Sequence, residues 1–320
     1  MTGYARVQRE NFEGATNALA AGKTDSCRSW ALKALYRARK QDDCAAKADA
    51  YLLLSRAEFI DSRASNSHGW SALALKSAEA MHDPYRAAES LEMQSCTATS
   101  LGLTELAASS AKESLRLRGH HPDYQALAHS YNYLAVASAW MGDTANADGL
   151  FTESAEFAGE SSSPDQRFQP LVNQCFSQML DIQAALYERP SAGLNDVNMD
   201  LLYRRFHNCR QMLLAGQTGV LNKGMQDLVT LLLVTLGCQI SQLLGEQHEG
   251  DQYLQACRSR ASRLPTTHWA RSLHWWAELE CARASGDHRR ERFSRDAMKR
   301  AAQKGEHRPL YLLAHLGEPV

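Results

Sequence analysis

The segment 131–154 constrains the fold of this chain more than any other stretch. Two amphipathic stretches flank one Gly142-Asp143 turn, and the glycine can adopt the positive φ that ends a helix. Within each stretch the marked residues are spaced by three or four, so they share one face of a helix. These faces consist of Tyr131, Leu134, Ala135 and Ser138 in the first stretch and Ala147, Phe151 and Ser154 in the second. The pattern predicts two antiparallel helices that pack through these faces.

The same segment resembles the tetratricopeptide repeat (TPR), a helix pair with a bulky residue, Leu and a small residue, followed by Ala-x3-Phe. Tyr131 stands at the bulky position, Leu134 at the Leu position and Ala135 at the small one. Ala147 and Phe151 match the second helix. Two features depart from the family, because a serine replaces the usual tyrosine of the first helix and no proline closes the unit.

A constant period extends the pattern towards the N-terminus. Steps of 40 residues from Gly142 reach Gly102, Ser62 and Gly22. Leu115, Leu75 and Leu35 keep the same register on the second helices. The period exceeds the roughly 34 residues typical of the family and predicts longer helices, as in the extended TPR arrays of bacterial regulators. Beyond residue 160 the period is lost.

The chain is therefore predicted to be all-α, a TPR-like α-solenoid of about seven antiparallel helix pairs. Residues 1–160 hold four regular pairs, 161–306 irregular pairs and 307–320 a capping or connector helix, in one continuous superhelix. Only 8 prolines in 320 residues agree with this. In detail, Asp25 or Ser26 is expected to cap the second helix, and the loop 63–69 to be longer than its counterparts.

Composition favours a soluble chain in a reducing compartment. The net charge is −1, so electrostatics indicates neither a nucleic acid nor an acidic membrane as a partner. Eight cysteines form no C-x-x-C pair and are interpreted as reduced, mostly buried side chains. Met1–Arg9 has no apolar signal core, and the apolar run Leu228–Leu244 carries enough polar residues to predict a core helix. We expect a cytoplasmic protein.

No stretch indicates catalysis, a cofactor or a metal. Phosphate-binding, dinucleotide-binding, zinc-protease and serine-hydrolase motifs are missing from the sequence. His120, His121 and Asp123 could offer metal ligands, but no cluster completes a site, and a solvated turn is the preferred interpretation. The basic run 288–292 is interpreted as the solvated face of an outer helix.

The concave surface remains as the candidate site. The TPR resemblance implies that the first helix of each pair lines this groove. Of the two adjacent tryptophans, Trp275 is predicted to pack between helices and Trp276 to face the groove. The predicted groove consists of Arg9, Phe12, Arg56, Phe59, Glu92, His129, Asn132, Val136, Trp140, Trp276 and Arg283. Aromatic side chains between Arg and Asn suit recognition of a peptide or helix. The basic clamp of TPR receptors for chaperone tails is missing here.

The resemblance implies a non-catalytic interaction or sensing module of a bacterial signalling protein. It is similar to the regulatory regions that precede output domains such as diguanylate cyclases, and the final stretch 309–320 is expected to lead into such a domain. A stand-alone regulator that binds a peptide signal in its groove is the alternative, and an enzyme is a third hypothesis. A protein or peptide is the expected partner, without a membrane or direct nucleic acid, and a homodimer is left open.

Overall fold

The computed structural model describes residues 3–119, 123–161, 167–188, 199–217 and 223–316. Within these ranges every regular element is an α-helix. The regular pairs are α1 (Gly3–Ala20) with α2 (Thr24–Lys40), α3 (Cys44–Ile60) with α4 (Ala64–Ala80), α5 (Pro84–Leu101) with α6 (Thr104–Arg118), and α7 (Tyr124–Trp140) with α8 (Thr144–Glu160). The later pairs are α9 (Phe168–Glu188) with α10 (Met199–Leu214), α11 (Lys223–Leu243) with α12 (Gln247–Ala261), and α13 (Arg271–Ala284) with α14 (His288–Lys304). A short α15 (Arg308–Leu313) follows. The all-α solenoid is confirmed.

The backbone of the turns carries the predicted period of 40 residues. Gly22, Ser62, Gly102 and Gly142 all take positive φ, at 70°, 61°, 76° and 82°. This left-handed conformation ends the first helix of each pair and reverses the chain. Serine adopts it at a cost that glycine avoids. The turns therefore confirm the register of the first four pairs.

Two local predictions were wrong. The cap of α2 is at Lys23, because α2 begins at Thr24 and leaves Asp25 within the first turn. The loop expected over 63–69 does not exist, since α4 begins at Ala64. Ser62 accepts the left-handed conformation, so the chain reverses there as tightly as at the glycine turns.

The core changes in character along the solenoid. Helices α1–α8 pack through small side chains, such as Ala31, Ala74 and Ala135, which are fully buried. From α9 onward the core consists of large residues, among them Phe168, Leu236 and Trp276. Leu134 and Phe151 are buried in the smaller clusters between α5 and α8.

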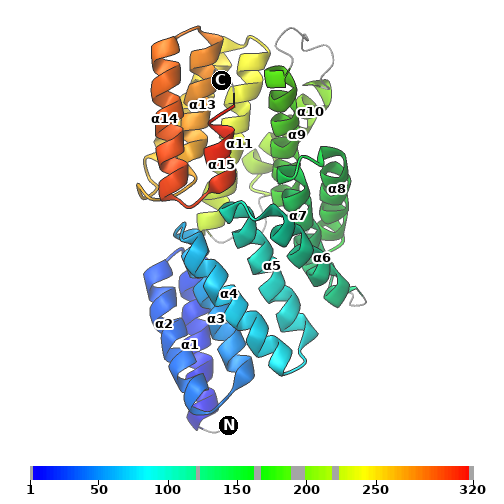
Figure 1. Ribbon diagram of the computed structural model, residues 1–320, viewed down its shortest axis with the longest axis vertical. Coiled ribbons are helices and arrows are strands. Elements are labelled where there is room, and N and C mark those ends of the chain that lie inside the picture. Colours follow the sequence, from blue (N-terminus) through cyan, green and yellow to red (C-terminus); the bar gives the residue numbers. More distant parts are fainter. Residues whose placement is uncertain (1–2, 120–122, 162–166, 189–198, 218–222, 317–320) are drawn as a thin grey trace.

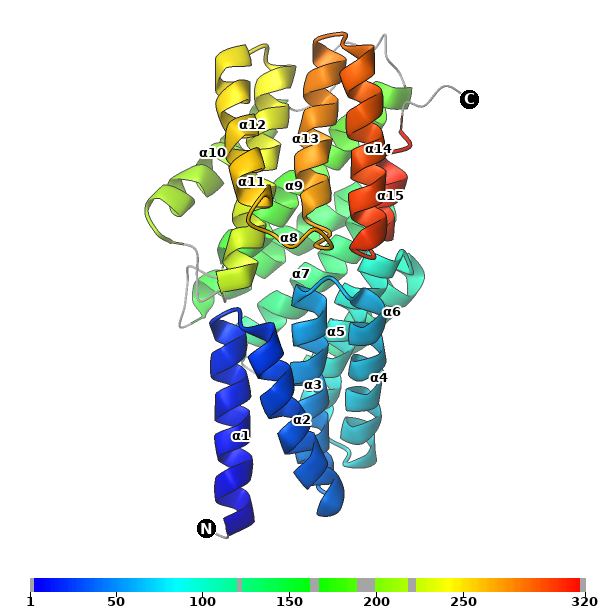
Figure 2. The same cartoon turned by 90° about the vertical axis from the view of Figure 1, so that its left-hand side faces the viewer.

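The superhelix curls until its C-terminal end meets its N-terminal helices. In Figure 1 the helices α1–α4 occupy the lower half, α11–α15 the upper half, and α5–α9 connect them along one side. Figure 2 shows the same arrangement from the side, with the α3–α4 end facing the orange and red helices. The contact is made by hydrogen bonds from Trp269 N to Ser62 Oγ (3.1 Å) and from Ser65 N to Glu306 Oε2 (2.7 Å). We call these two bonds the ring closure.

By length and composition alone, helix α11 is long and apolar enough over Gln226–Leu243 to cross a membrane. Of this window, 61% is buried inside the fold, and Leu231, Leu236 and Ile240 are almost fully covered. The segment is a core helix here, as predicted.

The eight cysteines are all free thiols, and six of them are buried. Cys44 and Cys96 are partly exposed. The prediction of mostly buried thiols is confirmed.

Candidate functional site

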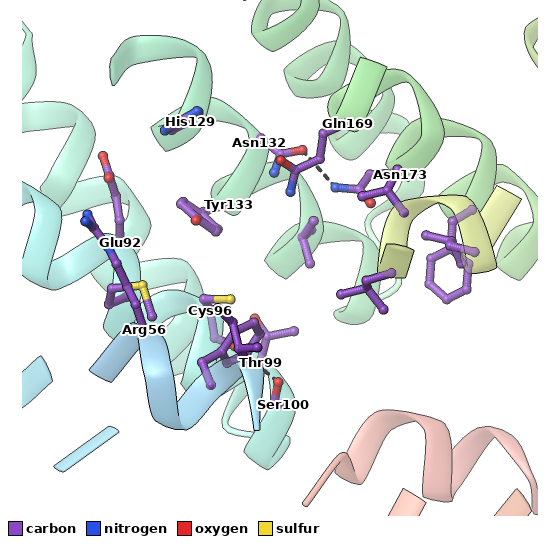
Figure 3. A pocket seen from close by; sticks show the side chains of 18 of the residues that line it. Arg56, Glu92, Cys96, Thr99, Ser100, His129, Asn132, Tyr133, Gln169 and Asn173 are labelled. Carbon is purple, nitrogen blue, oxygen red and sulfur yellow. Dashed lines mark hydrogen bonds between the residues drawn. The ribbon is translucent and has the colours of Figure 1, made fainter. Parts of the chain in front are cut away.

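A cavity of about 630 Å³ lies on the concave side of the solenoid. Its volume falls within the roughly 300–1,000 Å³ of pockets that hold small ligands. The first helices of the pairs supply most of its wall, from Leu19 on α1 to Leu273 on α13. His307, the cap residue of α15, and Leu310 within α15 also contribute. Figure 3 shows the polar side chains that converge on this space from α3, α5, α7 and α9.

The wall repeats with the period of the sequence. Residues 40 apart stand side by side on successive first helices, so each lining position forms a column. The columns are Leu19, Phe59, Thr99 and Ala139; Arg56, Cys96, Val136 and Phe176; Ile60, Ser100 and Trp140; Glu89, His129 and Gln169; Met93, Tyr133 and Asn173; Tyr85 with Gln125; and Glu92 with Asn132. The cavity is thus a direct product of the repeat.

The cavity is charged at one end. Glu92 is buried, and its Oε1 accepts hydrogen bonds from Arg118 Nε (2.7 Å), Ser114 Oγ (3.1 Å) and Ser130 Oγ (2.5 Å). Arg56 and Glu89 form a second ion pair at 3.7 Å, too long for a hydrogen bond. Burial raises the pKa of the Glu89 carboxyl, although Arg56 opposes this shift.

Three titratable side chains in this region, His129, Tyr133 and Cys96, are uncharged at neutral pH. His129 is exposed and lines the cavity, and desolvation by the protein atoms around it lowers the pKa of its imidazole. Burial raises the pKa of the Tyr133 hydroxyl, and it raises the pKa of the Cys96 thiol to about 12. At neutral pH these groups offer hydrogen bonds rather than charge.

The middle of the cavity is lined by amides. Asn173 Nδ2 on α9 donates to Asn132 Oδ1 on α7 at 3.0 Å, as the dashed line in Figure 3 marks. Within the described residues neither side chain has another hydrogen-bond partner, so the Asn132 amino group and the Asn173 carbonyl remain available. We call these two residues the amide pair. Gln169 lies close to Asn132 in Figure 3, and Gln125 also lines the cavity.

The other end of the cavity is apolar and aromatic. Trp140 packs edge-on against Phe176, with ring centroids 5.6 Å apart, and against His307 at 6.1 Å. His307 in turn lies 4.5 Å from the Trp269 ring. Burial lowers the pKa of His307 to about 3, so this ring is neutral and adds to the apolar wall. Leucines from α11, α13 and α15 complete the wall.

The structure brings seven of the eleven predicted groove residues together around this cavity. They are Arg56, Phe59, Glu92, His129, Asn132, Val136 and Trp140. Arg9 and Phe12 stand at equivalent positions on α1 but lie outside the wall. Arg9 is exposed and pairs with Glu13 at 2.6 Å, and Phe12 packs on the N-terminal core.

Trp276 and Arg283 require correction. Trp276 is only 1% exposed and donates to Gln183 Oε1 at 3.1 Å, so it belongs to the core and forms no groove surface. Trp275, predicted to pack between helices, is the less buried of the two and contacts Phe293. Arg283 pairs with Glu280 and donates to the Leu316 carbonyl at 2.6 Å, away from the cavity wall.

Several lining residues were missed from the sequence. Asn173 and Phe176 lie on α9, 40 residues after the lining residues Tyr133 and Val136, so the period continues onto this helix. Extending the period past residue 160 would have identified both. Trp269 and His307 come from turns between C-terminal helices, and only the curling of the superhelix brings them to the site. His120 and His121, considered as metal ligands, lie outside the described residues.

No protein-family model matches this sequence, and no curated protein matches it. Among solved structures, the fold is similar to the apo form of RapI, with a TM-score of 0.63 and 12% identity over 93% of this chain and 97% of that one. It is also similar to a Rap protein complexed with competence and sporulation factor, with a TM-score of 0.67 and 12% identity over 93% of this chain and 75% of that one. At this identity the likeness shows the fold alone, a TPR-like α-solenoid.

Proposed function

We propose that this protein is a non-catalytic regulator that binds a short, extended peptide in the concave cavity. The observation that carries the proposal is the amide pair of Asn132 and Asn173. Their mutual hydrogen bond leaves the Asn132 amino group as a donor and the Asn173 carbonyl as an acceptor for a ligand. A peptide unit offers the complementary acceptor and donor, whatever its side chain.

The rest of the cavity supports the same ligand. Trp140 and Phe176 offer an aromatic end where an apolar side chain would be buried, and central aromatic residues dominate many recognition surfaces. The cavity volume suits a ligand of a few residues rather than a folded domain. A solenoid of this fold has been solved in complex with competence and sporulation factor, which adds support from another protein.

The finer predictions from the sequence stay proposals. Neither comparison structure supports the resemblance to the regulatory regions of diguanylate cyclases, so a stand-alone regulator is now the preferred form. The cytoplasm is the proposed compartment, because a reducing environment suits eight free thiols.

A pooled binding experiment tests the proposal. The full chain is incubated with a pool of synthetic pentapeptides of randomised sequence, and retained peptides are identified by mass spectrometry. The chain is expected to retain a subset with apolar residues at one end, and Trp140→Ala to lose it. The double variant Arg289→Ala, Arg292→Ala on the outer helix α14 is the control and should retain the same subset. Failure of the folded chain to retain any peptide would count against the function.

A further inference from the structure

The two ion pairs at the charged end of the cavity differ in how many hydrogen bonds their charged groups make. Glu92 and Arg118 form the buried pair, and two serine hydroxyls complete its hydrogen bonds. The Arg118 guanidinium also stacks on the Tyr85 ring, 5.0 Å from its centroid. Exchanging this pair for a ligand would break several good contacts at once.

Arg56 and Glu89 form the loose pair. Their closest atoms are 3.7 Å apart, and within the described residues neither side chain has a hydrogen bond. The Arg56 side chain is 40% exposed and lines the cavity, so its N–H groups face the space that a ligand would fill. Guanidinium groups bind carboxylates through two parallel hydrogen bonds, which Glu89 does not offer in this geometry.

Burial affects the two charges of the loose pair differently. Arginine keeps its charge under all physiological conditions. Glu89 can become neutral by taking up a proton, and desolvation already raises the pKa of its carboxyl. A ligand that expels water from this end thus meets the permanent positive charge of Arg56 and the negative charge of Glu89, which protonation can neutralise.

We propose that Arg56 is an anion site and that the ligand carries a carboxylate, which replaces Glu89 as the partner of Arg56. This inference rests on the proposed peptide function. When the carboxylate binds, Glu89 loses its cation and gains a negative neighbour, so it takes up a proton from solvent. The ligand is therefore a peptide with an anionic end, which meets Arg56, and an apolar end, which meets Trp140.

The other charged groups near Glu89 leave this assignment intact. Asp49 on α3 is held by Arg86 through two hydrogen bonds, at 2.7 and 3.0 Å. Glu92 and Arg118 form an ion pair, and His129 on α7 is neutral because desolvation lowers the pKa of its ring. Asp123 caps α7 by accepting from Ala126 N at 3.0 Å.

Two pentapeptide pools of randomised sequence test the inference, one with free C-terminal carboxylates and one with C-terminal amides. Preferential retention of the acid pool would assign the carboxylate to the ligand C-terminus. Retention of amides enriched in Asp or Glu would assign it to a side chain. In either case Arg56→Gln should abolish the preference for the anionic group.

Proton uptake is tested on the best-retained acidic peptide. Its affinity should fall by up to about tenfold per pH unit as pH rises above the Glu89 pKa, since one proton is bound with the ligand. Glu89→Gln should bind tightly at all these pH values and remove the slope. Folding of both variants is checked by circular dichroism.

The outcomes separate the two proposals. If both pools are retained alike, without enrichment of acidic residues and without an effect of Arg56→Gln, the anion site is wrong while peptide binding stands. If neither pool is retained by the folded chain, both proposals are contradicted. A pH slope that persists in Glu89→Gln would overturn the role of Glu89.

Discussion

The main-chain amide of Trp269 donates a hydrogen bond to the Ser62 hydroxyl at 3.1 Å, across 207 positions of sequence. Glu306 reinforces this contact, because its carboxylate accepts from Ser65 N in the first turn of α4. Helix α4 has no side-chain cap of its own, since Arg63 at the cap position makes no such hydrogen bond. The C-terminal end thus caps a helix of the second repeat and closes the solenoid around its cavity.

Because Ser62 has a positive φ, the hydrogen bond from Trp269 to Ser62 can be removed by a glycine substitution that suits this backbone conformation. Ser62 and Glu306 both take positive φ, where glycine stands in several equivalent turns. Ser62→Gly should relieve about 1 kcal/mol of strain but lose a hydrogen bond of about the same value, so stability should hardly change. His82→Gly, in a left-handed turn that takes no part in the ring closure, is the control and should gain up to about 1 kcal/mol. Urea unfolding compares them, and an equal gain in both would mean that the hydrogen bond from Trp269 to Ser62 adds no stability.

Packing of the fourth repeat is tested at two adjacent positions. Leu134 is buried between helices, so Leu134→Ala should cost about 2–5 kcal/mol of unfolding free energy. Ala135 has no exposed surface, and Ala135→Leu should cost about 1–3 kcal/mol by overpacking. Unchanged denaturation midpoints in both variants would show that the repeat register is wrong.

The two tryptophans of the core and of the cavity should respond differently to truncation. Trp276→Ala removes a fully buried ring and should cost about 3–5 kcal/mol. Trp140→Ala removes a partly exposed ring, so the loss of stability should be smaller and the loss of ligand binding larger. Thermal melting together with peptide retention distinguishes them. Equal destabilisation would make Trp140 a core residue.

Acid should destabilise the protein through buried histidines. Burial lowers the pKa of His307 to about 3 and that of His268 to about 4, both next to the ring closure. The folded state binds fewer protons than the unfolded state, so their contribution is complete above about pH 6.5 and is lost as pH falls towards 3. Each buried histidine costs up to about 1.4 kcal/mol per pH unit in that window.

The substitution His307→Asn isolates the contribution of His307 to the acid destabilisation. Nδ1 of His307 accepts from Leu310 N at the start of α15, and Asn can provide the same cap without titrating. Urea unfolding at several pH values should show a shallower acid limb in the variant. An unchanged slope would mean that His307 is not the group that titrates.

The thiols predict a simple labelling pattern. Cys44 is partly exposed and should react first with a bulky maleimide under native conditions. Cys96 is also partly exposed but should react slowly, because burial raises the pKa of its thiol to about 12 and leaves little thiolate. Cys44→Ser should remove the fast phase of labelling. A fast phase that persists in this variant would contradict the low reactivity expected of Cys96 and of the six buried thiols.

The sequence predicted most of the fold because the repeat is local. Helix length, turn glycines and the 40-residue period all depend on neighbours along the chain, so columns such as Arg56, Cys96 and Val136 could be read directly. The error at 63–69 arose because Ser62 replaces a turn glycine. Ser62 takes a positive φ and accepts a hydrogen bond from Trp269 in the distant C-terminal half. Serine as a residue type does not indicate this left-handed conformation.

The C-terminal half of the site was harder to predict because it depends on how far the superhelix curls. Small differences in packing angle add up over seven pairs, and they decide whether Trp269 and His307 reach the cavity. Trp276 was misplaced for a related reason. With the period lost, the adjacent Trp275 and Trp276 could not be assigned to core and groove by spacing alone.

The most direct test of peptide binding in the cavity is calorimetric titration of the best-retained pentapeptide into three forms of the protein. They are the parent chain, Asn173→Ala and the outer-helix double variant Arg289→Ala, Arg292→Ala. Loss of the amide pair should weaken binding about fivefold or more, as expected for hydrogen bonds worth about 1–3 kcal/mol in a buried site. The outer-helix variant should bind like the parent. Unaltered affinity in Asn173→Ala, with affinity lost in the outer-helix variant, would place the interface on the convex face and contradict the account.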